Sequence, residues 1–158
     1  LREYAAQQLG GRTLGSTVVA LLLSDRTGVC LWAGDSRLYR LRSGQLGRIS
    51  RDHSAVQEMV DAGAITPEEA ASHPQSNVIT RAVGGSERLL VDAAVFAPEA
   101  GDTYLLCSDG LYNEVADDVI RRKMALAPDE GVRQLLEEAL HNGGRDNVSI
   151  ILVRLEEG

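Results

Sequence analysis

Apolar and polar positions along this chain of 158 residues divide it into short apolar runs and segments with helical spacing. Residues 16–24 and 29–33 are rich in apolar and β-branched side chains, and residues 38–42 alternate between apolar and basic side chains. A Ser-Gly turn then leads into residues 45–50. These runs, each bounded by turn residues, predict strands joined as hairpins. The continuous apolar runs further predict strands that are covered on both faces.

Four segments show the signals of helices. Residues 54–63 and 66–72 each begin with a capping-box pattern, Ser-x-x-Gln in the first and Thr-x-x-Glu in the second. Apolar residues at helical spacing predict two longer helices over residues 117–126 and 129–144, and a Gly-Gly pair ends the second. The chain therefore carries two short helices in its middle and two more near its end.

Further apolar runs predict strands over residues 77–83, 89–96, 103–108 and 148–155. Strands and pairs of helices thus alternate along the chain, and hairpin turns recur, which predicts one α+β domain with mainly antiparallel sheets. The chain opens without Met inside a helical pattern over residues 1–9. This start predicts a fragment, a processed product, or a sequence from which earlier residues are omitted.

Composition and charge exclude several classes of protein. Hydrophobic residues make up 44% of the chain and the net charge is −7. A nucleic-acid partner is not expected, because such domains present a basic face. No apolar run approaches the roughly 20 residues of a membrane span. Cys30 and Cys107 lie inside apolar runs, so we expect buried thiols in a reducing compartment and a cytoplasmic protein.

Three carboxylates stand at the ends of apolar runs, beside small residues. Asp35 and Asp109 each follow such a run, and Asp146 precedes one. Carboxylates near the ends of buried strands are costly unless they are hydrated, hydrogen-bonded or neutralised by a cation. Oxygen ligands with room for water suit Mg²⁺ or Mn²⁺, whereas the histidines and cysteines are not spaced for zinc.

Each acid taken alone also fits a simple turn. Asp-Gly and Asp-Asn are common turn dipeptides, and Asp35 could pair with Arg37 at a hairpin corner. Together the three acids favour one shared acidic site. The residues by themselves predict only a metal site with oxygen ligands in an α+β domain.

Six short motifs occur in an order that resembles the metal-dependent protein phosphatases of type 2C. They are Gly-Ser-Thr at 15–17, Ala-Gly-Asp-Ser-Arg at 33–37, Asp-His-Ser at 52–54, Ile-Thr-Arg-Ala-Val-Gly at 79–84, Leu-Cys-Ser-Asp-Gly-Leu at 106–111 and Gly-Gly-Arg-Asp-Asn-Val at 143–148. The stretch 65–85 is most similar to bacterial members, in which it forms a mobile flap beside the active site.

This resemblance implies a four-layer αββα sandwich, in which two mainly antiparallel sheets are flanked by helices. It implies a single catalytic domain over residues 1–158, incomplete at its N-terminus, with a flap over residues 54–85. It also implies a centre of two Mn²⁺ or Mg²⁺ ions at one end of the sandwich. Asp109 and Asp146 match acids of that centre, and Asp35 resembles the acid that, with Asp109, holds a third and weaker ion.

Four neighbours of these acids are expected to support them. Asn147 resembles a residue that supports Asp146, and Gly110 is the small neighbour of Asp109. Ser36 and Arg37 resemble structural parts of the strand end, and Arg37 is expected to be an ion-pair partner rather than a phosphate ligand.

The early segment of the family has no counterpart in this sequence. It carries further metal ligands, a His proposed as general acid and an Arg that grips the substrate phosphate, so no catalytic residue beyond the metal ligands is expected here. The histidines present do not replace it. We expect His53 to be structural, His73 to be solvated within the flap, and His141 to cap a helix end.

The resemblance implies a protein serine/threonine phosphatase in which metal-activated water attacks the phosphate. Its partners would be phosphorylated proteins and a cognate Ser/Thr kinase, and the 158 residues alone are expected to be weakly active or inactive. One alternative is a phosphatase-like binding or regulatory module that does not hydrolyse its ligand. Another is a structural α+β domain with solvated turn acids.

Overall fold

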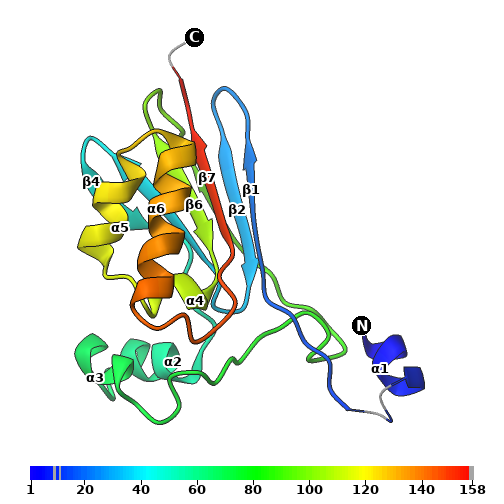
Figure 1. Cartoon of the computed structure of the whole chain (residues 1–158). Helices are drawn as coiled ribbons and strands as arrows, with labels where there is room; N and C mark the ends of the chain where they lie inside the picture. The colour runs from blue at the N-terminus through cyan, green and yellow to red at the C-terminus, as the bar shows by residue number, and fades with distance from the viewer. Residues whose placement is uncertain (9, 11, 157–158) are drawn as a thin grey trace.

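Two antiparallel sheets lie face to face in this computed structural model, which describes residues 1–8, 10 and 12–156 (Figure 1). The three-stranded sheet has the order β1 (Val18–Leu23), β2 (Gly28–Ala33), β5 (Asp92–Phe96). The four-stranded sheet has the order β4 (Gln45–Arg48), β3 (Arg37–Arg42), β6 (Thr103–Cys107), β7 (Ile150–Arg154). Every neighbouring pair is antiparallel. The predicted α+β fold, a sandwich of two antiparallel sheets with packed helices, is confirmed.

The helices differ in what they cover. They are α1 (Arg2–Gln8), α2 (Ala55–Asp61), α3 (Pro67–Ala71), α4 (Asp109–Tyr112), α5 (Asp117–Met124) and α6 (Pro128–His141). Helices α5 and α6 pack on the outer face of the four-stranded sheet, whereas α2 and α3 lie beyond one end of the sandwich (Figure 1). No helix among the described residues combines the length and apolar character needed to cross a membrane.

Two apolar layers form the core. Between the sheets, Trp32 and Cys30 of β2 pack with Leu38 and with Tyr104 and Leu106 of β6. On the other side of the four-stranded sheet, α5 and α6 cover a second cluster, in which the fully buried residues include Leu105, Leu111, Ile120, Met124 and Leu135. Burial on both faces explains why all five residues of β6 are buried.

The outer face of the three-stranded sheet is apolar but open. The strand register places Val29 of β2 beside Leu22 of β1 and Val95 of β5, and 54% of Leu22 and 72% of Val95 are exposed. Among the described residues no helix lies against this face (Figure 1). The described residues therefore form three of the four layers that the family resemblance implies.

The strand predicted over residues 77–83 does not form. This segment makes only isolated bridges, from Ile79 to Ser54 and from Val83 to Ser16. Ile79 is 39% exposed, so the apolar residues have no buried face that would hold them in a sheet. Local β-propensity is therefore overridden by the lack of a packing partner.

Two further parts of the chain differ from the prediction. The strand predicted from residue 89 begins at Asp92, because residues 89–91 are exposed. After β6, the chain turns at once into the four-residue helix α4, which the sequence pattern does not predict. Asp109 therefore lies in the first turn of a helix.

Candidate metal centre

The corner between β6 and α4 presents Asp109 at one end of the sandwich. Ser108 is the residue before α4, and Asp109 is the first residue of that helix. The Gly110 N–H donates to Asp109 Oδ1 at 2.9 Å, which holds the half-buried carboxylate against its own backbone. The fully buried strand β6 thus fixes the base from which this acid projects.

A second corner, between α6 and β7, presents Asp146. Gly144 adopts φ +54°, a conformation that turns the chain out of α6 and that glycine tolerates best. The Asn147 N–H donates to Asp146 Oδ1 at 2.6 Å, in the same way that Gly110 holds Asp109. Asp146 itself is exposed.

Ser108 ties these two corners together. Its hydroxyl donates to the Asn147 carbonyl at 3.1 Å and accepts from the Ser149 N–H at 2.9 Å. Gly110 lies against the same backbone, since a Cβ built on it would be 2.4 Å from the Asn147 oxygen. The two predicted supporting residues, Gly110 and Asn147, therefore meet where the two corners touch.

The third acid, Asp35, lies on the turn that follows β2. Gly34 precedes it with φ +114°, and a Cβ there would lie 2.4 Å from the Thr17 side chain. Thr17 Oγ1 lies 2.8 Å from the hydroxyl of the predicted supporting residue Ser36. The Tyr112 hydroxyl of α4 donates to the Asp35 carbonyl at 3.0 Å. Helix α4 therefore carries Asp109 and also holds the loop of Asp35.

Electrostatics also links Asp35 to Asp109. Burial, and then the negative charge of Asp109, raise the pKa of Asp35 to about 6. A raised carboxyl pKa means that the ionised form is destabilised by its surroundings. A cation close to these two acids would relieve that cost.

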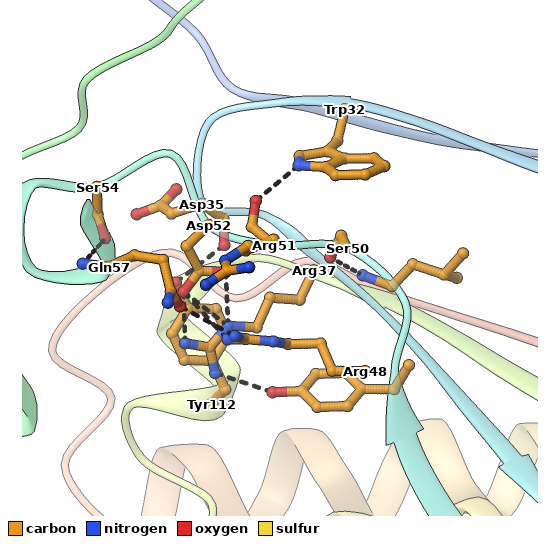
Figure 2. A network of polar contacts seen from close by, with 12 residues as sticks. Trp32, Asp35, Arg37, Arg48, Ser50, Arg51, Asp52, Ser54, Gln57 and Tyr112 are labelled. Atoms are coloured by element: carbon orange, nitrogen blue, oxygen red, sulfur yellow. Dashed lines mark hydrogen bonds and ion pairs between the residues drawn. The ribbon is translucent and has the colours of Figure 1, made fainter. Parts of the chain in front are cut away.

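Arg37 pairs with Asp52 (Figure 2). Its Nη2 lies 2.6 Å from Asp52 Oδ2, and its Nη1 donates to the Tyr39 hydroxyl at 2.9 Å. The guanidinium carbon also lies 3.4 Å from the centre of the Tyr112 ring. Arg37 is thus held on all sides as an ion-pair partner. The hairpin-corner alternative, in which Asp35 pairs with Arg37, does not describe this geometry.

One cavity of about 930 Å³ connects the three predicted acids. Asp35, Asp109 and Asp146 line it at the end of the sandwich, and Val60 and Ala70 line it from α2 and α3. Gly110 and Arg37 also line the cavity, whereas Ser36 and Asn147 do not. Acids that are far apart in the sequence therefore face a common space.

The donor set fits part of a metal site. Among the described residues, no three His, Cys, Asp or Glu side chains are grouped closely enough to hold a metal ion by themselves. Mg²⁺ and Mn²⁺ prefer oxygen donors, and Mg²⁺ is usually bound by one or two carboxylates with several waters retained. Carboxylates that face an open cavity therefore fit such an ion, with the rest of its shell supplied by water or other groups.

None of the three histidines lines this cavity. His53 is 7% exposed and stacks on Trp32. His73 Nδ1 accepts a hydrogen bond from the Gln75 N–H within an exposed turn. His141 is in the last turn of α6.

Two contacts in the cavity wall were not predicted from the sequence. Tyr112 contacts the Asp35 loop, and its position one turn after Asp109 is a signal only if α4 is recognised as a helix. Arg145 pairs with Glu114, with its Nε 2.8 Å from Oε1. No local sequence pattern predicts the pairing of Arg145 with Glu114.

Curated relatives give the class of this protein. PstP of Mycobacterium tuberculosis, a serine/threonine protein phosphatase, is 43% identical over 143 residues, which cover 88% of this chain and 27% of PstP. The serine/threonine phosphatase stp of Listeria welshimeri is 35% identical, with 95% of this chain and 60% of stp covered. No protein-family model matches the sequence. Both relatives are named as serine/threonine phosphatases.

Solved structures agree. A crystal structure of the M. tuberculosis phosphatase PstP/Ppp superposes with a TM-score of 0.92 at 38% identity, covering 99% of this chain and 66% of that one. A PstP catalytic domain in complex with two manganese ions gives 0.88 at 34% identity, with 99% and 65% covered. The chain belongs to the metal-dependent protein phosphatases of type 2C, and is similar to bacterial members. It spans less than two thirds of the length of the curated relatives named here.

Proposed function

We propose that these residues form part of the metal-binding end of a protein serine/threonine phosphatase, which hydrolyses phosphoserine and phosphothreonine with water activated by two Mn²⁺ or Mg²⁺ ions. The observation that carries the proposal is the shared cavity of Asp35, Asp109 and Asp146. The similarity to a PstP catalytic domain that holds two manganese ions supports it.

Asp109 and Asp146 would hold the cations of the two-metal centre, and Asp35 would join Asp109 at a third, weaker one. When bound, the cations would supply an activated water and neutralise charge on the phosphate. The chain's own backbone fixes the orientation of these two ligands, because the amides of Gly110 and Asn147 each hold one carboxylate oxygen. Ser36 and Arg37 would support the strand end beside them through Thr17 and Asp52.

No protein nucleophile is needed in this mechanism. Burial raises the pKa of Cys30 to about 11 and the pKa of Cys107 to about 12, so both thiols stay protonated near neutral pH. These buried free cysteines also support a reducing, cytoplasmic location.

The substrate would be a phosphorylated protein that enters between the acids and residues 54–85. We propose this segment as the flap of a single domain over residues 1–158. Support comes from the two capped helices α2 and α3, which line the cavity opposite the acids. Apolar side chains there, such as Val60, would contact the peptide beside its phosphate. A cognate Ser/Thr kinase would supply the phosphoprotein.

The alternative of a non-hydrolytic module is not favoured, since the curated relatives are named phosphatases. A decisive test measures Mn²⁺ binding by calorimetry and hydrolysis of a phosphothreonine peptide, both in the full-length protein. We expect Asp109→Asn to abolish hydrolysis and weaken Mn²⁺ binding. Asp25→Asn, in the turn between β1 and β2 at the other end of the sandwich, is the matched control. Equal Mn²⁺ binding by both variants would refute the proposal.

A further inference from the structure

His53 holds the residue before Asp35 by two hydrogen bonds. The His53 N–H donates to the Gly34 carbonyl at 2.9 Å, and the Gly34 N–H donates to His53 Nδ1 at 3.2 Å. The imidazole is 7% exposed, and it stacks on Trp32 with ring centres 6.1 Å apart. Its position is therefore fixed by packing as well as by hydrogen bonds.

These two bonds fix both peptide units that flank Gly34. The Gly34 N–H belongs to the peptide with Ala33, and its carbonyl belongs to the peptide with Asp35. Gly34 has φ +114°, a conformation open to it because the backbone of a glycine is freer to rotate than that of other residues. Holding both peptide planes removes that freedom, and so sets the direction in which the chain enters Asp35.

The other ring nitrogen of His53 is held from the opposite side. Because Nδ1 accepts a hydrogen bond, the proton of the neutral ring is assigned to Nε2. Nε2 lies 3.1 Å from Asp92 Oδ2, and Arg81 Nη1 lies 2.7 Å from Asp92 Oδ1. Asp92 thus accepts from both His53 and Arg81, and this arrangement keeps Nδ1 free to accept from Gly34.

The backbone of His53 also reaches the end of the proposed flap. Its carbonyl accepts from the Thr80 N–H at 2.8 Å, and the Ala55 N–H donates to the Val78 carbonyl at 2.9 Å. One residue therefore contacts the Asp35 loop, the end of the segment 54–85 and, through Asp92, strand β5.

We propose that His53 is a positioning residue for the cation site of Asp35, acting through the backbone of Gly34 and joining that site to Thr80 and Arg81. This inference rests on the proposed metal-dependent function. It assigns to His53 a role beyond the structural one expected from the sequence, since a residue that only fills the core would not need an acceptor aimed at Gly34.

Two substitutions separate the two ring nitrogens. In His53→Asn, the oxygen of the shorter amide side chain can take the place of Nδ1, so this variant keeps the acceptor for Gly34 and loses the contact with Asp92. His53→Gln places an amide near Nε2, so it keeps the contact with Asp92 and loses the acceptor for Gly34. Both variants remove the ring that stacks on Trp32, so their losses of core packing are matched.

The test measures Mn²⁺ affinity by calorimetry and exchange of the Gly34 amide proton by NMR without metal, both in the full-length protein. We expect His53→Gln to weaken the Asp35-dependent Mn²⁺ site by about tenfold, as residues behind metal ligands commonly do, and to speed Gly34 exchange. His53→Asn should stay within about twofold of the unaltered protein in Mn²⁺ affinity. In an Asp35→Asn background, His53→Gln should add no further loss.

Equal Mn²⁺ affinities for His53→Gln and His53→Asn would overturn the inference, whatever their stabilities. A second measurement needs no substitution: Mg²⁺ binding should slow Gly34 exchange in the unaltered protein, because coupling between two sites is reciprocal. Unchanged exchange would also overturn it. If Asp109→Asn leaves Mn²⁺ affinity unchanged, the proposed metal centre itself fails. If it weakens affinity while the two His53 variants agree, only the role of His53 fails.

Discussion

The backbone of Gly110 lies so close to Asn147 that a Cβ at position 110 would be 2.4 Å from the Asn147 carbonyl oxygen. This contact brings together the two corners that carry Asp109 and Asp146. It gives a physical reason for the Asp-Gly pair at the end of β6, because any larger residue would push the corners apart. The metal-binding proposal depends on this contact.

Gly110→Ala should therefore damage both stability and metal binding. We expect a loss of about 2 kcal/mol in the free energy of unfolding, the usual cost of forcing an extra carbon into a packed site. Mn²⁺ affinity should fall as well. Gly47→Ala is the control, because a Cβ at position 47 meets no atom within 4 Å. Urea unfolding and calorimetry measure the two effects, and similar results for both variants would contradict the role of the contact.

Replacing the acids should affect activity more than folding. In the full-length protein, Asp109→Asn and Asp146→Asn should each lower Mn²⁺-dependent hydrolysis by orders of magnitude, and Asp35→Asn should lower it less. Metal-free thermal stability should stay equal or rise, because a repelling carboxylate is removed. A sharp fall in metal-free melting temperature with normal activity per folded molecule would show that the acids are structural.

The raised pKa of Asp35 predicts a dependence of stability on pH. The folded state holds the proton up to a pKa of about 6, above the usual value of an unfolded aspartate. The stabilising contribution is therefore complete below about pH 4 and is lost as the pH rises through about 6. Since Asp35 is partly exposed, solvent screening reduces the expected loss in free energy of unfolding to about 2 kcal/mol.

Asp35→Asn should remove this loss, and saturating Mn²⁺ should also reduce it in the unaltered protein. The measurement is urea unfolding at pH 4.5 and 7.5, with a chelator or with Mn²⁺. If the difference in stability between the unaltered protein and Asp35→Asn is the same at both pH values, the environment assigned to Asp35 is wrong.

A buried ion pair at the far end of β6 predicts the opposite dependence on pH. Burial alone would raise the pKa of Asp102, but hydrogen bonds from Arg42, Tyr104 and the Glu99 amide lower it to about 2. The resulting stability is present above about pH 4 and is lost as the pH falls toward 2.

Asp102→Asn should lower the free energy of unfolding at pH 7 by about 3 kcal/mol, since it leaves Arg42 without its buried partner. Glu99→Gln, at the exposed partner of the same arginine, is the control and should cost less than about 1 kcal/mol. Mn²⁺ affinity should not change in either variant, because this pair lies at the opposite end of β6 from Asp109. Urea unfolding and calorimetry check both expectations.

The sequence predicted the parts of this structure that depend on local pattern. Apolar runs identified the strands of both sheets, and capping signals identified α2 and α3, where Ser54 and Thr66 accept from the backbone as expected. The three acids were identified from their small neighbours at strand ends, and the structure brings them to one cavity.

Features that depend on distant contacts could not be predicted in the same way. Residues 77–83 have the composition of a strand, but no buried surface is available to them. Arg37 pairs with Asp52, and Tyr112 contacts the Asp35 carbonyl. Both contacts join segments that only the fold brings together. Helix α4 was missed because four residues carry too little periodicity to reveal a helix.

The open face of the three-stranded sheet has a practical consequence for experiments on these residues alone. Leu22 and Val95 flank Val29 on an apolar surface that is open to water. Surfaces of this kind attract one another and bind fluorescent dyes that report exposed apolar groups. A preparation limited to these 158 residues should therefore aggregate as its concentration rises. Assays should be run at low protein concentration or in a longer polypeptide.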